Sequence, residues 1–319
     1  MFQWFQEPKI DFMAPRRFFL LLSTLGCLAG VYACVLLWQG KAVLGTDFGT
    51  GVQLRLSAGN DVSVDAIRQA LKTGGFPESQ IQEASDETKK GFQFIIKIKY
   101  DPSKAVGSMG DDVLALFTKT FPDAKFNLDG SDEVGPAVSQ KLRGDAFKAF
   151  FLSMVGILLY IIWRFKKFEF GVAAVITTIH DILVILGIIV LTHREFNLLQ
   201  VTALLTLAGY SLNDTVVTFD RIRENMKFLV KDRNFIQLVN LSVNETLSRT
   251  INTSATVFLT LLPLTFIGGD VLKDFGLTLL LGIVVGTYSS IFVASPILVE
   301  WDLASRHKPQ SPQAQPAGK

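Results

Sequence analysis

Long apolar runs separated by short polar stretches dominate the chain. Six of these runs approach the roughly 20 residues that a helix needs to cross the hydrocarbon core of a bilayer. Each run therefore predicts a membrane-spanning helix. We place the six spans at 18–38, 147–163, 171–191, 197–218, 250–267 and 275–300.

The long polar segment at 39–146 has a different pattern. Apolar and polar residues alternate around 52–56 and again over 92–98, which is typical of half-buried strands. A first helical pattern begins after Ser63, a residue type that caps helices, and a second helical pattern covers 109–120. Two shorter strand patterns complete the order βαββαβ. That order predicts an α+β domain of the ferredoxin-like kind.

The distribution of Lys and Arg predicts the orientation. Basic residues gather in 1–17, after the second span, in the loop 219–249 and in the tail 301–319. With six spans all four regions fall on one side, which the positive-inside rule makes cytoplasmic, and 39–146 falls outside. The loop 219–249 alternates apolar and charged residues and predicts an amphipathic helix on the membrane surface. The Pro- and Gln-rich tail predicts disorder.

The predicted fold class is therefore a membrane all-α six-helix bundle with an inserted α+β ferredoxin-like extracytoplasmic domain. Composition agrees, because 49% of the side chains are hydrophobic and only 19% are charged. The three histidines and two cysteines exclude a histidine-rich metal site and a disulfide framework. No phosphate-binding loop or hydrolase motif is present. We therefore expect no enzymatic activity, no cofactor and no nucleic-acid partner, only a lipid bilayer around the helices.

Ionisable residues inside the spans are the strongest functional signal, because a charge there is costly and tends to be functional. Asp214 lies about one and a half turns before the cytoplasmic end of the fourth span, and Arg249 begins the fifth. These spans run antiparallel, so the two side chains lie at similar depth. Apolar surroundings favour the neutral acid, whereas a nearby guanidinium favours the carboxylate. The pair predicts a site that takes up and releases a proton; structural pairing, a neutral Asp214 and an Arg249 that reaches the headgroups are the alternatives.

Further polar and small residues accompany this pair. His180 and Asp181 lie near the middle of the third span and either extend a proton relay or satisfy polar groups between helices. Both interpretations remain open. Tyr210 and Asn213 in the fourth span are expected to form hydrogen bonds between helices.

The sixth span carries Gly282 and Gly286, four residues apart, with Ser289 close by. This spacing of small residues is typical of a surface that packs tightly against another helix.

Several of these residues lie in runs that resemble the SecF family of protein-export membrane proteins. The most specific run, in the fourth span, continues into the following loop. The matching segments are Gly209-Tyr210-Ser211-Leu212-Asn213-Asp214-Thr215, Phe219–Glu224, His180-Asp181, Ser248-Arg249-Thr250 and Gly286–Pro296.

This resemblance implies one half of a transporter of the resistance-nodulation-division type, paired with SecD in the bacterial inner membrane. It implies work with the SecYEG channel and the SecA ATPase on a translocating unfolded polypeptide, with YajC and YidC as further candidate partners. Protons would be the coupling ion, and Asp214 and Arg249 match the family's proton-pathway positions. The alternatives are a non-transporting scaffold of the translocon and half of a small-molecule exporter.

Overall fold

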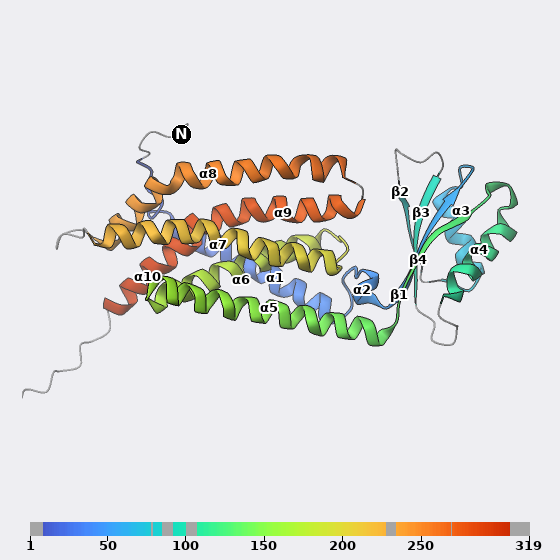
Figure 1. The fold of residues 1–319 in the computed structure, drawn as a ribbon, viewed down its shortest axis with the longest axis horizontal. Coiled ribbons are helices and arrows are strands. Elements are labelled where there is room, and N and C mark those ends of the chain that lie inside the picture. Colours follow the sequence, from blue (N-terminus) through green and yellow to red (C-terminus); the bar gives the residue numbers. More distant parts are fainter. Residues whose placement is uncertain are drawn as a thin grey trace, which may run out of the picture.

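The computed structural model describes residues 9–77, 79–84, 92–99, 107–227, 234–268 and 270–306. It has two parts, a bundle of long helices and a separate sheet domain at one end of the bundle (Figure 1). The predicted tail beyond residue 306, residues 228–233 of the predicted loop 219–249 and the first eight residues lie outside the described residues.

The bundle consists of long helices joined by short connections. Its helices are α1 (Arg16–Trp38), α5 (Pro136–Phe165), α6 (Phe168–Leu191), α7 (Leu198–Met226), α8 (Phe235–Ile267), α9 (Asp270–Ser289) and α10 (Ser295–Arg306), with a π-helical turn at Ser290–Ala294. The short α2 (Thr46–Gly49) lies between bundle and sheet (Figure 1).

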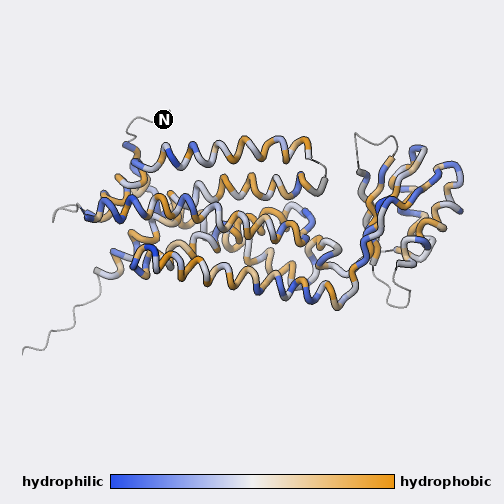
Figure 2. The backbone as a smooth tube through the Cα atoms, viewed as in Figure 1, coloured by the Kyte–Doolittle hydropathy of each residue, from blue (hydrophilic) through white to orange (hydrophobic). Residues whose placement is uncertain are grey.

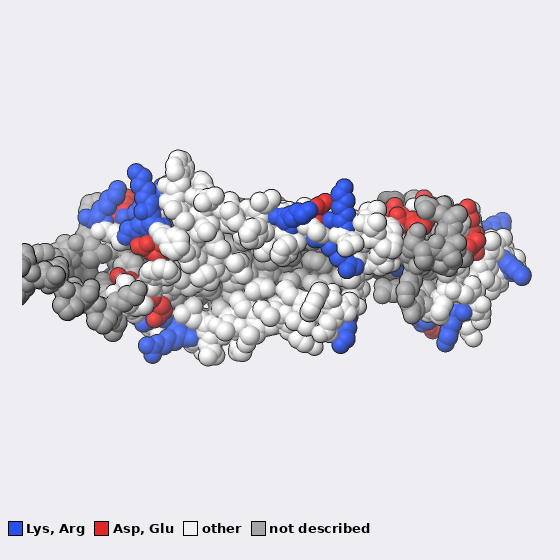
Figure 3. Space-filling model, turned by 90° about the horizontal axis from the view of Figure 1, so that it is seen from below, with Lys and Arg blue, Asp and Glu red and all other residues white. Residues whose placement is uncertain are grey.

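Most of the long helices of the bundle are strongly apolar along their length. In the described part of the chain five helical segments are long and apolar enough to cross a membrane, namely α1, α5, α6, α8 and the continuous stretch Leu272–Ser305. Helix α7, which contains the predicted fourth span, is not among them. The helices are mainly orange in Figure 2, and in Figure 3 charged side chains gather at the two ends of the helical part.

The sheet domain follows the predicted order of elements. Its elements are β1 (Gly51–Ala58), α3 (Val64–Thr73), β2 (Gln80–Ala84), β3 (Phe92–Lys99), α4 (Ser108–Thr120), a 3-10 turn at Pro122–Ala124 and β4 (Asn127–Val134). The strands are antiparallel in the spatial order β2-β3-β1-β4. Ser63 caps α3, accepting a hydrogen bond from the backbone N–H of Ala66.

Helices α3 and α4 cover one face of the sheet (Figure 1). Alternate side chains of β1 and β3 are buried beneath them, with Leu54, Phe94 and Phe117 among the largest fully buried side chains. The other face of the sheet is directed toward the bundle, which places its polar side chains next to the outer loops of the helices.

Helix α6 lies at the centre of the bundle. It is buried over most of its surface, apart from a stripe that includes Ile176 and Ile179, whereas α1 and α5 leave broad apolar surfaces exposed. The segment before α1 packs against the end of the bundle that lies away from the sheet domain. Met13 in this segment is fully buried, and the backbone N–H of Phe12 donates to Asn240 of α8 at 2.8 Å. A helix apolar on all sides belongs in the interior of a bundle, so α6 is placed where its carboxylate must find protein partners.

Several predicted boundaries need correction. The residues assigned to an amphipathic surface helix at 219–249 instead extend α7 to Met226 and begin α8 at Phe235, apart from those not described. Residues 301–306 of the predicted disordered tail are helical and belong to α10. The sheet domain ends at Val134, because Pro136, a residue favoured in a first helical turn, begins α5.

Candidate functional site

Asp181 of α6 is the most completely enclosed carboxylate of the bundle. Its side chain has no exposed surface. The imidazole Nδ1 of His180 lies 2.8 Å from Oδ1, and the hydroxyl of Ser289 donates to Oδ2 at 2.8 Å. The hydroxyl of Ser211 on α7 donates to the same oxygen. Three segments that are distant in sequence therefore converge on one acid.

Such convergence follows from the cost of burying a polar group in apolar surroundings. An isolated carboxylate inside a bundle is strongly unfavourable, and each hydrogen bond offsets part of that cost. Helix α6 offers few polar neighbours of its own, so the hydroxyl groups come from α7 and α9. The arrangement ties three helices together around the Asp181 carboxyl.

Asp214 of α7 lies in a second polar cluster. Its side chain is buried, and Oδ2 accepts a hydrogen bond from the hydroxyl of Ser254 on α8 at 3.1 Å. The hydroxyl of Thr287 on α9 donates to Ser254 Oγ at 2.7 Å. The hydroxyl oxygen of Tyr210, one turn before Asp214, is buried and has no hydrogen-bond partner among the described residues. Asp214 is thus linked to α8 and α9 through hydroxyl groups.

Arg249 lies near Asp214 without touching it. Its side chain is exposed on α8, and within the described ranges no hydrogen bond or ion pair joins the two side chains. Arg249 lies five residues before Ser254, the residue of α8 that donates to the Asp214 carboxyl. Thr253, one turn after Arg249, is half-buried, and Ser254 is buried.

The Asp181 and Asp214 clusters are adjacent along one face of α7. Ser211 and Asp214 are three residues apart and lie on one face of the helix, and each belongs to a different cluster. A Cβ atom at Gly286 would lie 3.0 Å from Ser211 Cβ, and one at Gly282 would lie 2.5 Å from Leu207 Cδ1. The close approach of α9 to α7 at these glycines brings Ser289 and Thr287 within reach of the carboxylates.

The remaining residues of the fourth-span motif are divided between two sides of α7. Thr215 is buried, and its hydroxyl donates to the backbone carbonyl of Ser211 at 3.4 Å. Gly209 and Asn213 are exposed, and no atom lies within 4 Å of a Cβ built at Gly209. Neither of them is part of the packing surface within this chain.

Exposed polar residues and one exposed glycine lie along α7 and α8, and we call this set the polar face. It comprises Thr202, Thr206, Gly209, Asn213, Arg249, Thr256 and Thr260. The members recur every three or four residues on α7 and after seven and four residues on α8, so they lie on one side of each helix. A polar side in the middle of long apolar helices is unfavourable against lipid. This face therefore calls for a polar protein surface or water.

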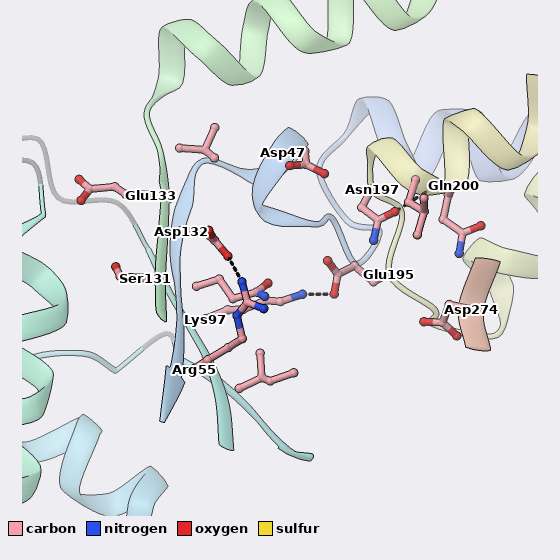
Figure 4. A pocket seen from close by; sticks show the side chains of 14 residues that line it. Asp47, Arg55, Lys97, Ser131, Asp132, Glu133, Glu195, Asn197, Gln200 and Asp274 are labelled. Atoms are coloured by element: carbon pink, nitrogen blue, oxygen red, sulfur yellow. Dashed lines mark hydrogen bonds and ion pairs between the residues drawn. The ribbon is translucent and has the colours of Figure 1, made fainter. Parts of the chain in front are cut away.

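The loop between α6 and α7 connects the bundle to the sheet domain. Glu195 in this loop forms an ion pair with Lys97 of β3, and both side chains are largely buried (Figure 4). The next residue, Phe196, pairs with the segment before α2, donating its backbone N–H to the carbonyl of Val43 at 2.8 Å. Burial lowers the pKa of the Lys97 ammonium, and the nearby carboxylates of Asp47 and Asp274 act in the opposite direction.

A cleft of about 660 Å³ opens at this junction (Figure 4). Its walls are the side of the sheet that is directed toward the bundle and, opposite it, the outer ends of α7 and α9. Arg194 pairs with Asp274 at the start of α9 across the same region. The six residues between α6 and α7 thus contact β3, α9 and the segment before α2 at once.

Sequence reasoning missed Ser254, whose hydroxyl donates to Asp214, although it is a small polar residue within an apolar span. Ser289 was named only as part of a surface that packs against another helix, and its role as a donor to Asp181 was not predicted. Only the packing of α7 against α8 and α9 shows which hydroxyls face a carboxylate.

Long apolar helices with two carboxylates buried among them define a helical membrane protein with ionisable groups in its core. Residues 113–304 match the family model described as "Protein export membrane protein SecD/SecF, C-terminal". The chain belongs to this family.

Its relatives agree over nearly the whole length. The chain is 39% identical to the protein translocase subunit SecF of Thermodesulfovibrio yellowstonii, covering 94% of this chain and 97% of that protein. It is 37% identical to the subunit SecDF of Thermus thermophilus, covering 93% of this chain but 39% of that protein.

A solved structure shows the same architecture. The crystal structure of SecDF from Thermus thermophilus, described as a translocon-associated membrane protein, superposes with a TM-score of 0.80 at 35% identity, over 94% of this chain. The chain spans 40% of that longer protein.

Proposed function

We propose that this chain is a SecF-like subunit of the Sec protein-export machinery that uses the proton gradient to promote polypeptide translocation across the inner membrane. The observation that carries the proposal is the Asp214 carboxyl, buried in a membrane bundle one helix face away from exposed polar side chains. One charge that crosses the membrane releases about 2.3 kcal/mol per 100 mV, so a titrating acid here has a usable energy source.

Proton transfer at Asp214 would change how α7, α8 and α9 pack. When Asp214 is ionised, its hydrogen bond from Ser254 and its attraction to the charge of Arg249 are strong. When Asp214 is neutral, both interactions are weaker. The buried hydroxyl of Tyr210, which lacks a partner in the described structure, is a further candidate to exchange hydrogen bonds with the acid. The cluster has the features of a two-state switch biased by a local charge change.

The outer domain would receive this change through the loop between α6 and α7. Helix α7 carries Asp214 and begins at Leu198, directly after the loop residues that contact the sheet. Because α7 is one continuous helix, a shift at Asp214 moves its outer end as well. Glu195 and Lys97 then carry the motion to β3. We infer that the βαββαβ domain is of the ferredoxin-like kind and acts as the outer moving part.

SecD is the partner that we propose for the polar face. The relative from Thermus thermophilus is named SecDF and is more than twice the length that this chain covers. A second six-helix half of the same transporter type, with polar residues of its own, would cover Asn213, Arg249 and Thr256 and supply a further acid. SecYEG and SecA are proposed partners on the same grounds, and YajC and YidC follow from the resemblance alone.

We propose six spans with both termini in the cytoplasm. Helix α7 crosses as the fourth span despite its polar residues, because its neighbours α6, α8 and α9 and the partner subunit would satisfy them. Reporter fusions at Lys119 of α4 and at Lys227 after α7 should report opposite sides of the membrane. The same side for both would rule out this topology.

Replacement of Asp214 by Asn tests the coupling. The variant keeps the shape and the hydrogen bond from Ser254 but cannot ionise. We expect the proton-gradient-dependent part of export, measured in inverted vesicles after SecA has been exhausted, to fall at least tenfold. Asp65→Asn, which removes an exposed carboxylate of α3, should leave export unchanged.

Export that remains fully gradient-dependent in Asp214→Asn would instead support the scaffold, in which the buried acids are only structural. The small-molecule exporter is less favoured because a single outer domain of about 80 residues, from β1 to β4, offers no enclosed substrate funnel. No cofactor and no enzymatic step enter this proposal.

A further inference from the structure

An apolar cavity of about 360 Å³ opens between α1, α5, α6 and α7, near the end of the bundle that faces the sheet domain. Its lining is almost entirely apolar, with Phe150, Leu186 and Leu205 as typical members. The one charged side chain among the described lining residues is Arg143 of α5. The cavity belongs neither to the carboxylate clusters nor to the junction cleft.

The depth of the cavity matches one leaflet of a bilayer. Its deepest member on α6, Ile182, lies nine residues before the outer end of that helix at Leu191. At 1.5 Å per residue this is about 14 Å, close to half of the roughly 30 Å hydrocarbon core. Trp38 at the outer end of α1 is 90% exposed, and tryptophan typically marks the headgroup level.

Arg143 lies at the mouth of the cavity. It precedes Phe147 and Phe150 by one and two turns of α5, so all three share one side of the helix. One guanidinium nitrogen donates to the backbone carbonyl of Phe48, which fixes the side chain in place. A guanidinium has five N–H donors and binds phosphate oxygens in pairs, so donors remain for a ligand.

The charge at this mouth is positive. Arg143 is the one charged side chain among the described lining residues, and the nearby acid Asp145 is paired with Lys148 at 3.1 Å. An unopposed guanidinium binds the phosphate oxygens of an anion. The local charge therefore favours an anionic over a zwitterionic headgroup.

We propose that this cavity binds one anionic phospholipid of the outer leaflet, with an acyl chain between α5 and α7 and its phosphate on Arg143. The site is independent of proton coupling, since it involves neither Asp181 nor Asp214. A bound lipid would fill the space where α1, α5 and α7 fail to meet and would fix the outer ends of these helices beneath the sheet domain.

Native mass spectrometry of the full-length chain tests the proposal. Delipidated protein is titrated with phosphatidylglycerol or phosphatidylethanolamine, and the same titration is made on Arg143→Gln, Ala146→Phe and Arg17→Gln. We expect one retained phosphatidylglycerol per wild-type chain, with at least tenfold weaker retention of phosphatidylethanolamine. Arg143→Gln should lose that preference, and Ala146→Phe, which fills the cavity, should lose retention of both lipids.

Arg17→Gln is the matched control, because Arg17 is an exposed arginine that flanks α1 at the opposite end of the bundle. It should retain the lipid as the wild type does. Equal retention of both lipids that only Ala146→Phe abolishes would overturn the headgroup assignment. Retention unchanged in both cavity variants would overturn the site itself, and so would loss of the lipid on binding of a partner subunit or a second copy. Should Ala146→Phe not fold, as judged by thermal unfolding, Arg143→Gln decides alone.

Discussion

Hydroxyl groups donate to both buried acids of this bundle, and the imidazole of His180 also contacts Asp181. Ser211 and Ser289 donate to Asp181, and Ser254 donates to Asp214. Sequence analysis identified both acids because a charge within an apolar run stands out. It did not identify Ser254, because a lone hydroxyl in a span can equally bond to its own helix, as many here do.

The expected pairing of Asp214 with Arg249 shows the same limit. Equal depth in antiparallel spans fixes only where the two residues lie along the membrane normal, not which way their side chains point. The rotation of α8 about its axis decides the contact, and it directs Ser254 inward and leaves Arg249 exposed. That rotation depends on packing that no local pattern encodes.

Replacement of Ser289 by Ala tests the role of the hydroxyl donors. We expect the variant to lose about 1–3 kcal/mol of stability, because one oxygen of a fully buried carboxylate loses a donor. Thermal unfolding of the purified chain measures the effect. The adjacent Ser290→Ala is the control, since Ser290 donates only to the backbone carbonyl of Thr287 on its own helix. Equal stability of the two variants would contradict a supporting role for Ser289.

Among the elements, most helices could be predicted from hydropathy, but their ends could not. Apolar runs stop at the membrane boundary, whereas backbone hydrogen bonding continues, so α5, α7 and α8 extend beyond the predicted spans. The strands of the sheet domain were easier, because alternation continues to the ends of β1 and β3. The crossing of α1 with α6 was missed altogether.

That crossing depends on two glycines, one on each helix. A Cβ atom at Gly30 of α1 would lie 2.2 Å from the backbone carbonyl oxygen of Leu183, and Gly187 of α6 lies against Gly30 itself. Small residues allow two membrane helices to approach this closely. The backbone atoms cannot move aside as a flexible side chain would.

Gly30→Ala should therefore separate α1 from α6 and destabilise the chain by about 1–3 kcal/mol, the range that overpacking gives. Gly156→Ala on α5 is the matched control. It has open space around the added methyl group, and alanine is a better helix former, so it should be neutral or stabilising by up to about 1 kcal/mol. Thermal unfolding and the solubility of the two variants compare them directly, and similar behaviour would refute the close crossing.

Across the whole molecule, a narrow junction joins the sheet domain to the bundle. Sequence analysis predicted both parts but had no means to predict their contact, because Lys97 and Glu195 are almost a hundred residues apart and each looks like an ordinary surface charge. In the structure they are largely buried and paired (Figure 4). Removal of one partner leaves the other charge buried and unpaired, which is unfavourable.

Glu195→Gln should loosen the sheet domain from the bundle. Spin labels at position 119 of α4 and position 272 of α9, in a chain with Cys27 and Cys34 replaced by Ser, report the distance between the two parts. We expect a broader distance distribution in the variant. Arg68→Gln breaks an exposed ion pair with Asp65 on α3, which does not line the junction cleft, and should leave the distribution unchanged. An unchanged distribution in Glu195→Gln would show that other contacts hold the domain.

The π-helical turn at Ser290–Ala294 has a consequence for both ends of the segment that contains it. A π turn holds one residue more than an α turn, so everything after it is rotated by about 100° relative to an uninterrupted α-helix. This offset lets Ser289 face Asp181 while Leu298 and Val299 still face the apolar interior near the other end. Deletion of a single residue within 290–294 would turn one of these two sides outward, so the length of this short stretch is fixed although its side chains are ordinary.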